Sequence, residues 1–269
     1  MIEPAGAWLG TDALVRALGS GELTVEGRLA GASNATVRCT VEVDAGIEVR
    51  CVYKPVSGER PLWDFPDGTL SGREVAAHEM SIALGWPIIP PTVWRDDGPA
   101  GPGMCQAWID IGPGRSVVDV ADPAEVAQGW LRVFEGVDGS GQPAVLVHED
   151  SLPLQRVALL DAVINNADRK GGHLLCDADG NLWGIDHGVC FSDEDKLRTV
   201  LWGWAGQPIP DDLLEALDVV QEHPAFERAL SWLLDEEIDA LLARIRRLRA
   251  GGRFPTPAGE WPAIPWPLF

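Results

Sequence analysis

Residues 165–175 read NNADRKGGHLL, and residues 183–191 read WGIDHGVCF. These stretches hold two carboxylates and one imidazole at fixed spacings, namely Asp168, His173 and Asp186. The segment between the last two predicts a short hairpin, which folds back and brings the three side chains to one site. One carboxylate that orients a hydroxyl, with two ligands that hold a metal ion on the phosphates, is the arrangement that phosphoryl transfer from ATP requires.

Protein kinases carry the same spacing, as D-x-x-x-x-N followed by D-F-G. In this chain the Asn position holds His173, and the D-F-G position reads Asp186-His187-Gly188. The imidazole is the main departure, because Mg²⁺ prefers oxygen ligands whereas imidazole suits softer ions. Three interpretations stay open for His173: a ligand of Mn²⁺, an indirect contact through a water on Mg²⁺, or no contact with metal. Direct ligation predicts higher activity with Mn²⁺ than with Mg²⁺.

The length and composition are those of a folded protein in a reducing compartment. The 269 residues, 46% of them hydrophobic, suffice for one large domain or for two lobes that share a cleft. No apolar run approaches the roughly 18 residues of a transmembrane helix, and the first residues, MIEPAGAWLGTD, do not read as a signal peptide. Five scattered cysteines without a C-x-x-C pair indicate free thiols. We therefore expect a cytoplasmic protein without a transmembrane segment.

The formal charge of −20 argues against nucleic acid and anionic membranes as partners, because such a field repels phosphate groups. The charge also serves plain solubility. Only three lysines occur, Lys54, Lys170 and Lys196, and the other cations are arginines. A lysine in such a chain is therefore a candidate for a position that requires a compact amine rather than a guanidinium. Abundant Gly, Ala and Arg are typical of a GC-rich bacterial genome.

The hydrophobic pattern predicts a sheet followed by helices. A helix at 71–85 has Ser71 and Glu74 at the spacing of a capping box. The other predicted elements are a helix at 11–19, strands at 22–30, 35–43 and 47–55, strands within 86–97 and 101–111, a weak helix at 123–135, a strong helix at 151–167, helices at 211–219, 224–233 and 235–250, and a proline-rich strap at 253–269.

Lys54 ends the third predicted strand, in VYKP. A strand-borne lysine that faces a cleft reaches the α- and β-phosphates of ATP, and a helix carboxylate holds it there. The helix at 71–85 offers Glu74 or Glu79 as that partner, and we favour Glu74. The plainer alternatives are a surface lysine and a capping carboxylate. The order lysine, glutamate, aspartate, metal ligand, aspartate along the chain favours the catalytic interpretation.

Four segments together, at 52–55, 71–93, 161–175 and 184–191, resemble the atypical kinases of the phosphatidylinositol 3-/4-kinase-like and HipA-like groups. The nearest likeness is to an uncharacterised actinobacterial phosphatidylinositol-kinase-like family. The resemblance implies an α+β, two-lobed protein-kinase-like fold, with an antiparallel sheet N-lobe over 1–109 and a mostly helical C-lobe over 110–269. It also implies ATP with Mg²⁺ or Mn²⁺ as cofactors, Asp168 as the residue that orients the acceptor hydroxyl, and Asp186 as a metal ligand.

The nucleotide contacts are less clear in the sequence, since neither G-x-x-x-x-G-K-[ST] nor G-x-G-x-x-G occurs. Backbone N–H groups in the turn at 30–36 would cradle phosphates, and backbone groups after the fifth strand would read adenine. A plain hairpin turn and a hydrophobic strand end explain the same residues equally well. The candidates are Gly31, Ser33 and Asn34 for the phosphates, and Gln106, Ala107, Trp108 and Ile109 for the base.

The acceptor is not identified by the sequence. Lys170, beside Asp168, is a candidate to neutralise the transferred group, and a solvated loop charge is the alternative. The segment after Asp186 is short and lacks A-P-E, so the usual peptide platform of protein kinases is missing. Trp202 and Trp204 are candidates for an acceptor pocket or for the core. A protein, a small molecule and a lipid headgroup all remain as acceptors, although the acidic SDEDK disfavours phosphoinositides. A nucleotide-binding pseudokinase and an AMP transferase are the alternative functions.

Overall fold

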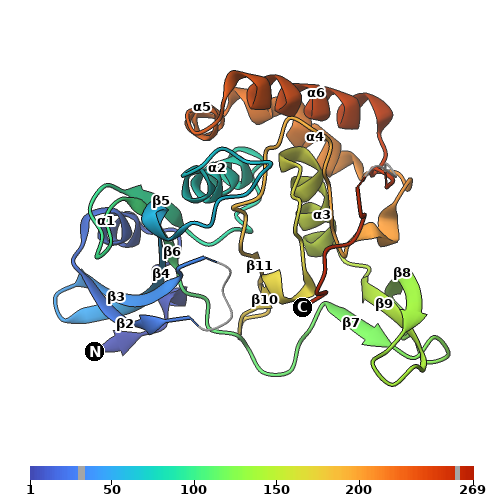
Figure 1. Ribbon diagram of the computed structural model, residues 1–269, viewed down its shortest axis with the longest axis horizontal. Coiled ribbons are helices and arrows are strands. Elements are labelled where there is room, and N and C mark those ends of the chain that lie inside the picture. Colours follow the sequence, from blue (N-terminus) through green and yellow to red (C-terminus); the bar gives the residue numbers. More distant parts are fainter. Residues whose placement is uncertain (30–33, 258–260) are drawn as a thin grey trace.

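The structure is a computed structural model, and it describes residues 1–29, 34–257 and 261–269. The fold is α+β, with a sheet lobe at the N-terminal side, a helical lobe, and a small separate sheet at the far end (Figure 1). The strands are β1 (Ile2–Glu3), β2 (Leu23–Arg28), β3 (Val37–Asp44), β4 (Ile47–Pro55), β5 (Thr92–Arg95), β6 (Gly103–Ala107), β7 (Val118–Ala121), β8 (Trp130–Val137), β9 (Pro143–Glu149), β10 (Leu174–Cys176) and β11 (Leu182–Gly184); the helices are α1 (Asp12–Ser20), α2 (Leu70–Ala83), α3 (Leu152–Ile164), α4 (Asp211–Val219), α5 (Pro224–Leu230) and α6 (Asp235–Gly251).

The sheet lobe has the strand order β2-β3-β4-β6-β5, and the short β1 pairs in parallel with β4. All other pairs in this sheet are antiparallel, as the strand pattern predicts. Alternate residues of β3 and β4 are buried against α1, so the lobe has a core of its own. The predicted start of α1 is confirmed, because the Thr11 hydroxyl accepts a hydrogen bond from the backbone N–H of Leu14 at 3.2 Å.

The start of α2 differs from the predicted capping box. The N-cap is Thr69, which makes no side-chain capping bond, and Ser71 lies inside the first turn. The carboxylate of Glu59, in the loop before the helix, accepts from the backbone N–H groups of Leu70 at 3.1 Å and Ser71 at 2.7 Å. A side chain outside the helix therefore accepts from two of its free N–H groups. Glu74 is not needed as a cap and contacts other groups.

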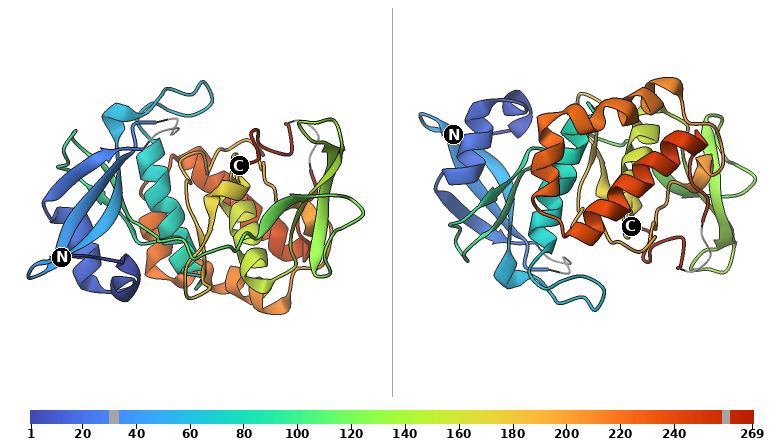
Figure 2. Two further views of the ribbon diagram at one scale, coloured as in Figure 1. Left: turned by 90° about the horizontal axis from the view of Figure 1, so that it is seen from below. Right: turned by 90° about the horizontal axis from the view of Figure 1, so that it is seen from above.

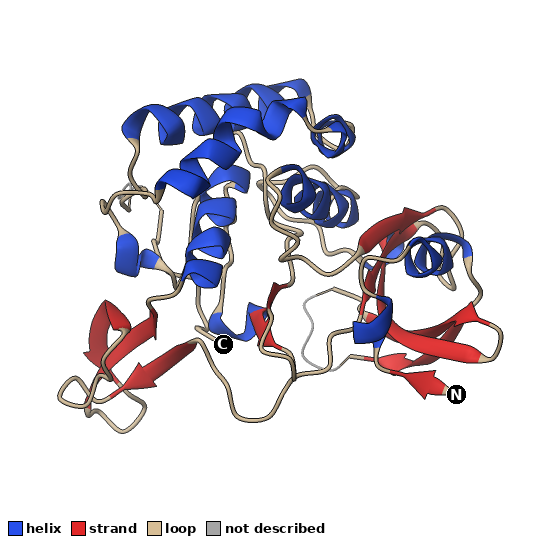
Figure 3. Ribbon diagram, turned by 180° about the vertical axis from the view of Figure 1, so that it is seen from behind, coloured by secondary structure: helices blue, strands red, loops and turns tan. Residues whose placement is uncertain are grey.

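The helical lobe is built around α3, which is apolar on nearly every side because α2, α6 and the hairpin β10–β11 enclose it. Figure 3 shows most of the helices gathered in this lobe, with α2 between them and the sheet. The hydrophobic core of the lobe extends into α2, through Ala76, Ala77 and Met80. Residues 261–269, the described end of the tail, lie beside β10 (Figure 1), where the N–H of Gly171 donates to the carbonyl of Leu268 at 2.8 Å. Figure 2 shows the molecule from below and from above.

The helix predicted at 123–135 is wrong. The strands β7, β8 and β9 form a three-stranded antiparallel sheet there, in the order β7-β9-β8. Ala, Glu and Val at 124–127 suggested a helix, but the aromatic and β-branched residues from Trp130 onward favour a strand, and Leu131 and Val133 pack against the helical core. Within the described ranges, no helix combines the length and the apolar composition that crossing a bilayer requires.

Candidate active site

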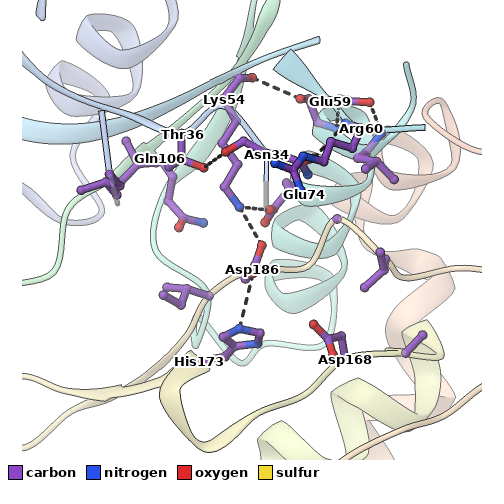
Figure 4. A pocket seen from close by; sticks show the side chains of 18 of the residues that line it. Asn34, Thr36, Lys54, Glu59, Arg60, Glu74, Gln106, Asp168, His173 and Asp186 are labelled. Atoms are coloured by element: carbon purple, nitrogen blue, oxygen red, sulfur yellow. Dashed lines mark hydrogen bonds and ion pairs between the residues drawn. The ribbon is translucent and has the colours of Figure 1, made fainter. Parts of the chain in front are cut away.

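Lys54 contacts two carboxylates at once, at the end of β4. Its Nζ lies 2.5 Å from Oε1 of Glu74, in the first turns of α2, and 2.8 Å from Oδ1 of Asp186, directly after β11. The second oxygen of Glu74 accepts the backbone N–H of His187 at 2.9 Å. Three elements from both lobes therefore meet at one ammonium group, as Figure 4 shows.

The charges of this cluster stabilise one another. Burial disfavours the ammonium of Lys54, but Asp186 and Glu74 more than offset it and raise its pKa. The nearby ammonium lowers the pKa of Asp186, which stays ionised. Burial raises the pKa of Glu74, and Lys54 counteracts part of this shift. Removal of the ammonium would therefore leave a buried carboxylate without its counter-charge.

Arg169 holds the backbone around Asp186 in place, although it adjoins Asp168 in sequence. Its guanidinium is fully buried, pairs with both oxygens of Asp161 in α3, and donates to the carbonyl of Ile185 at 3.1 Å. It also lies 2.6 Å from Nε2 of His187. Burial lowers the pKa of His187 well below its usual value, so Nε2 of the neutral ring accepts the bond. Asp186 itself has a left-handed backbone with φ of 62°, a conformation that this network stabilises.

Asp168 lies in the loop after α3, with its side chain 31% exposed. Its backbone N–H donates to the side-chain oxygen of Asn166 at 2.9 Å, and the Asn166 amide donates in turn to Asp161. Lys170 Nζ lies 3.0 Å from Oδ2 of Asp168. Lys170 therefore contacts the carboxylate that is predicted to orient the acceptor hydroxyl. Hydrogen bonds therefore hold the backbone of Asp168, while its carboxylate stays partly exposed in the wall of a cavity.

His173 ends a short turn before β10, with its Nε2 3.4 Å from Oδ2 of Asp186. Burial lowers its pKa, so the ring is neutral, and its Nδ1 has no partner among the described residues. A neutral ring nitrogen beside an ionised carboxylate fits two ligands of one divalent ion. The described residues contain no group of three or more such ligands, so phosphate oxygens and water would complete the coordination, as is usual for Mg²⁺ in nucleotide sites.

The cluster opens into one cavity of about 810 Å³ between the lobes. Asn34, Gln106, Trp108 and Ile109 line it, and so do Lys54, Glu74, Asp168, His173 and Asp186. Lys170 does not line it and contacts the site through Asp168. Gly31 and Ser33 lie outside the described residues. The side chain of Gln106 already donates to Thr92 Oγ1 at 2.7 Å. The N–H groups of Ala107 and Trp108 donate to Pro91 and Arg50. Of the four hinge candidates, Ile109 is therefore the one whose N–H has no backbone acceptor in the described part of the chain.

Other candidates lie away from this cavity. Trp204 is buried in the helical core, and neither it nor Trp202 lines the cavity. Glu79, the second candidate partner of Lys54, pairs instead with Arg228 at 2.7 Å. The sequence reasoning missed Glu59 and Asp161. A signal existed for Asp161, because a carboxylate in the otherwise apolar run of α3 requires a buried partner.

Two solved structures have the same arrangement of a sheet lobe and a helical lobe. The Golgi casein kinase matches with a TM-score of 0.53 and 16% identity, over 89% of this chain and 74% of that chain. The structure of hydra Fam20 with sugar matches with a TM-score of 0.57 and 14% identity, over 90% of this chain and 89% of that chain. At such low identity the likeness concerns the fold, which is a two-lobed atypical kinase fold.

The sequence comparison is closer. The chain is 48% identical over 265 residues to protein Rv2133c of Mycobacterium tuberculosis, and the match covers 94% of each chain. The chain therefore belongs to the same family as Rv2133c. No protein-family model matches the chain. Membership of a phosphatidylinositol-kinase-like family and a cytoplasmic location stay predictions.

Proposed function

We propose that this protein is an ATP-dependent phosphotransferase that moves a phosphoryl group to a hydroxyl acceptor. One observation carries the proposal: Lys54 is held by Glu74 and Asp186 at one wall of the cavity that Asp168 also lines. A lysine, its helix carboxylate, a metal-binding aspartate and a second aspartate are the parts that kinase-type phosphoryl transfer uses. In this proposal the lobes divide near residues 109 and 110, and ATP binds between them.

Each residue has a role in the proposed reaction. Lys54 positions the α- and β-phosphates, and Asp186 with His173 would hold Mg²⁺ or Mn²⁺, which supplies positive charge to the phosphate oxygens. The acceptor oxygen forms a bond to the γ-phosphorus, the bond to the ADP oxygen breaks, and the hydroxyl proton goes to Asp168. Lys170, 3.0 Å from Asp168, would neutralise charge on the transferred group. In this proposal Asn34 contacts the phosphates, Trp108 and Ile109 contact the base, and Gln106, whose side chain donates to Thr92, lines the same pocket.

The second candidate is a nucleotide-binding pseudokinase that acts as a switch or scaffold. His173 favours it, because the imidazole replaces the amide oxygen that kinases use as a metal ligand. The two proposals differ in turnover, since a pseudokinase binds the nucleotide and leaves it intact.

The test is ATP binding and turnover by the purified protein, with Mg²⁺ and Mn²⁺ side by side. We expect metal-dependent binding, transfer of label from γ-labelled ATP, and loss of turnover in Asp168→Ala with binding retained. Binding without turnover would favour the pseudokinase. Label from α-labelled ATP on the product would show AMP transfer instead, and full turnover by Asp168→Ala would refute the role of Asp168.

A further inference from the structure

A second end of the cavity is lined by residues that the proposed nucleotide site does not use. Arg198 lies next to the catalytic loop, because its N–H donates to the carbonyl of Asn166 at 2.9 Å and its carbonyl accepts from Arg169 at 3.0 Å. Trp63, from the loop before α2, and Trp261, from the tail, line the same cavity. Three segments far apart in sequence thus contribute to the wall of the cavity that Asp168 also lines.

The aromatic part of this wall is a built structure. The rings of Trp63 and Trp261 are stacked, with centroids 5.8 Å apart and an angle of 19° between their planes. Lys196 Nζ lies 4.9 Å from the Trp261 ring and 5.4 Å from the Trp63 ring, a cation–π arrangement. The same ammonium pairs with Asp64 at 3.3 Å and Glu194 at 3.1 Å and is almost fully buried. Lys196 therefore links three segments: the loop before α2, the tail, and the segment after Asp186.

Trp63 keeps an open surface despite this fastening, since 83% of it is exposed. An aromatic ring that stacks on a neighbouring ring and keeps an exposed surface can pack against the carbon skeleton of a ligand. The sequence offered Trp202 and Trp204 as candidates for an acceptor pocket, but neither lines this cavity. Trp63 and Trp261 do line it.

Arg198 is the cation on this side of the cavity. Its Nε donates to the carbonyl of Pro262 at 3.1 Å, which fixes the side chain. Among the described residues, no carboxylate lies within salt-bridge distance of its guanidinium. Lys54 is already offset by two carboxylates. Arg60 also lines the cavity, but its backbone N–H donates to the side-chain oxygen of Asn34 at 2.9 Å, and Figure 4 shows it beside Asn34 and away from Asp168. In a chain of net charge −20, a fixed guanidinium in the wall of the cavity that Asp168 also lines is the feature that would attract an anion.

We propose that the acceptor is a small hydroxyl compound that carries a phosphate or a carboxylate. Its anionic group pairs with Arg198, its carbon skeleton packs on Trp63 and Trp261, and its hydroxyl faces Asp168. This inference rests on the proposed phosphotransferase function. A peptide fits the site less well, because the carbonyl of Ala263 in the tail accepts from Thr199 at 3.0 Å and from Trp202 at 2.8 Å. The tail thus covers the surface after Asp186 along which a peptide would extend.

The experiment compares matched anionic and neutral probes on protein saturated with Mn²⁺ and a non-hydrolysable ATP analogue, which keeps the probes out of the nucleotide site. The pairs are glycerol 3-phosphate with glycerol, glucose 6-phosphate with glucose, and gluconate with glucitol. The readouts are probe affinity and, with ATP, probe-dependent release of ADP. We expect at least one anionic probe to bind and react about ten-fold or more better than its neutral partner, the gain of a charge-assisted contact. The phosphate and carboxylate pairs distinguish the two sources of charge.

Variants test the residues named. Arg198→Ala should reduce the preference for the anionic probe about ten-fold, and Arg198→Lys should restore part of it, because the charge remains but the planar fork is lost. Trp261→Ala should weaken the anionic and neutral members equally. Arg132→Ala, at an exposed pair with Glu135 on β8, is the control and should change neither.

The inference is wrong if the neutral probes match the anionic ones, if the preference survives Arg198→Ala, or if no anionic probe binds. Phosphorylation of a Ser/Thr peptide with no response to any probe would identify a protein acceptor instead. These outcomes are separable from failure of the proposed function, since nucleotide binding and the Asp168→Ala control are measured first. If the nucleotide fails to bind, the proposed function fails, and binding of the anionic probes to nucleotide-free protein still decides whether Arg198 forms an anion site.

Discussion

At the residue scale, the shared contact of Lys54 with Glu74 and Asp186 leads to the first prediction. Lys54→Met leaves Glu74 buried beside an apolar side chain, and burial then favours the protonated carboxyl. We expect ATP affinity to fall about ten-fold or more and turnover to be lost, since the proposed contact of Lys54 with phosphate and the positioned carboxylate of Glu74 disappear together. Lys54→Arg should not restore activity, because a guanidinium cannot replace a compact amine here. Calorimetric ATP titration is the measurement, and unchanged affinity would refute the assignment.

His173 leads to the second prediction, on metal preference. Its Nε2 faces Asp186 Oδ2 at 3.4 Å, and imidazole favours Mn²⁺ over Mg²⁺. Wild-type protein should therefore turn over faster with Mn²⁺, and His173→Asn should shift the ratio of Mn²⁺ to Mg²⁺ rates toward Mg²⁺ by about ten-fold. Rates over a concentration series of each ion measure the ratio. An unchanged ratio in His173→Asn would show that the ring does not contact the metal.

The sequence alone predicted the proximity of some site residues and not of others, for a physical reason. Asp168, His173 and Asp186 lie on one loop and one hairpin, so their spacing along the chain determines their distance in space. Glu59 and Arg198 depend on contacts that form only when distant segments pack, and no local pattern marks them. Their assignment required the tertiary structure.

At the element scale, α2 depends on a carboxylate outside it, and this gives the third prediction. Glu59→Ala removes both capping bonds from the N–H groups of Leu70 and Ser71. We expect a loss of about 1–2 kcal/mol in unfolding free energy, together with weaker nucleotide binding, because the same helix carries Glu74. Glu59→Gln should retain part of the stability, since the amide keeps one acceptor. Urea unfolding is the measurement, with the exposed Glu125→Ala as a control that should change little.

The contact between β9 and the turn at 202–204 gives the fourth prediction, a dependence of stability on pH. His148 is buried, its Nε2 accepts from the N–H of Gly203 at 3.0 Å, and burial lowers its pKa. The folded state therefore resists protonation while the unfolded state takes up a proton below about pH 6.5. The neutral ring contributes no penalty above that pH, and stability falls as pH decreases from 6.5. The loss is at most about 1.4 kcal/mol per pH unit for one proton.

The comparison is between wild type and His148→Gln, each unfolded in urea at several values of pH from 7.5 to 5.5. The variant should show a flatter dependence by up to one proton, whatever its absolute stability. Parallel curves for the two proteins would mean that His148 titrates alike in both states.

Local sequence patterns predicted most of the helices and strands, and β8 is the exception. The residue pattern of β2 to β4 is that of strands, and a short turn joins β3 to β4, so their positions follow from the sequence alone. The strand β8 lies in a region whose first residues, at 123–127, have helical propensity, and it pairs with β9, across a loop, through a ladder with a bulge. Its identity depends on that pairing and on the burial of Leu131 and Val133, which propensity does not express.

At the scale of the whole molecule, the boundary between the two hydrophobic cores does not coincide with the boundary between strands and helices. One core joins the strands of the sheet lobe to α1, and the other joins α2 to the helical lobe. Although α2 lies within 1–109 and also contacts β5 and β6, we expect Glu74 to move with Asp186 and the helical lobe, and Lys54 to move with the sheet. A movement that opens the cleft would separate Lys54 from both carboxylates rather than swing α2 away.

Arg73 provides the fifth prediction, which tests this division. The side chain is buried, pairs with Glu237 of α6, and donates to the carbonyl of Cys190 at 2.7 Å. Arg73→Ala leaves Glu237 buried without its counter-charge, which should cost about 3–5 kcal/mol. Arg73→Met with Glu237→Leu should recover only part of that loss, because it also removes the bond that Glu237 accepts from the N–H of Leu234. In hydrogen exchange, Arg73→Ala should reduce protection in α2, α6 and residues 186–192, while α1 and β3 keep theirs because they belong to the other core. Equal loss of protection in α1 and β3 would show that α2 is coupled to the sheet, and that the helix carrying Glu74 moves with Lys54.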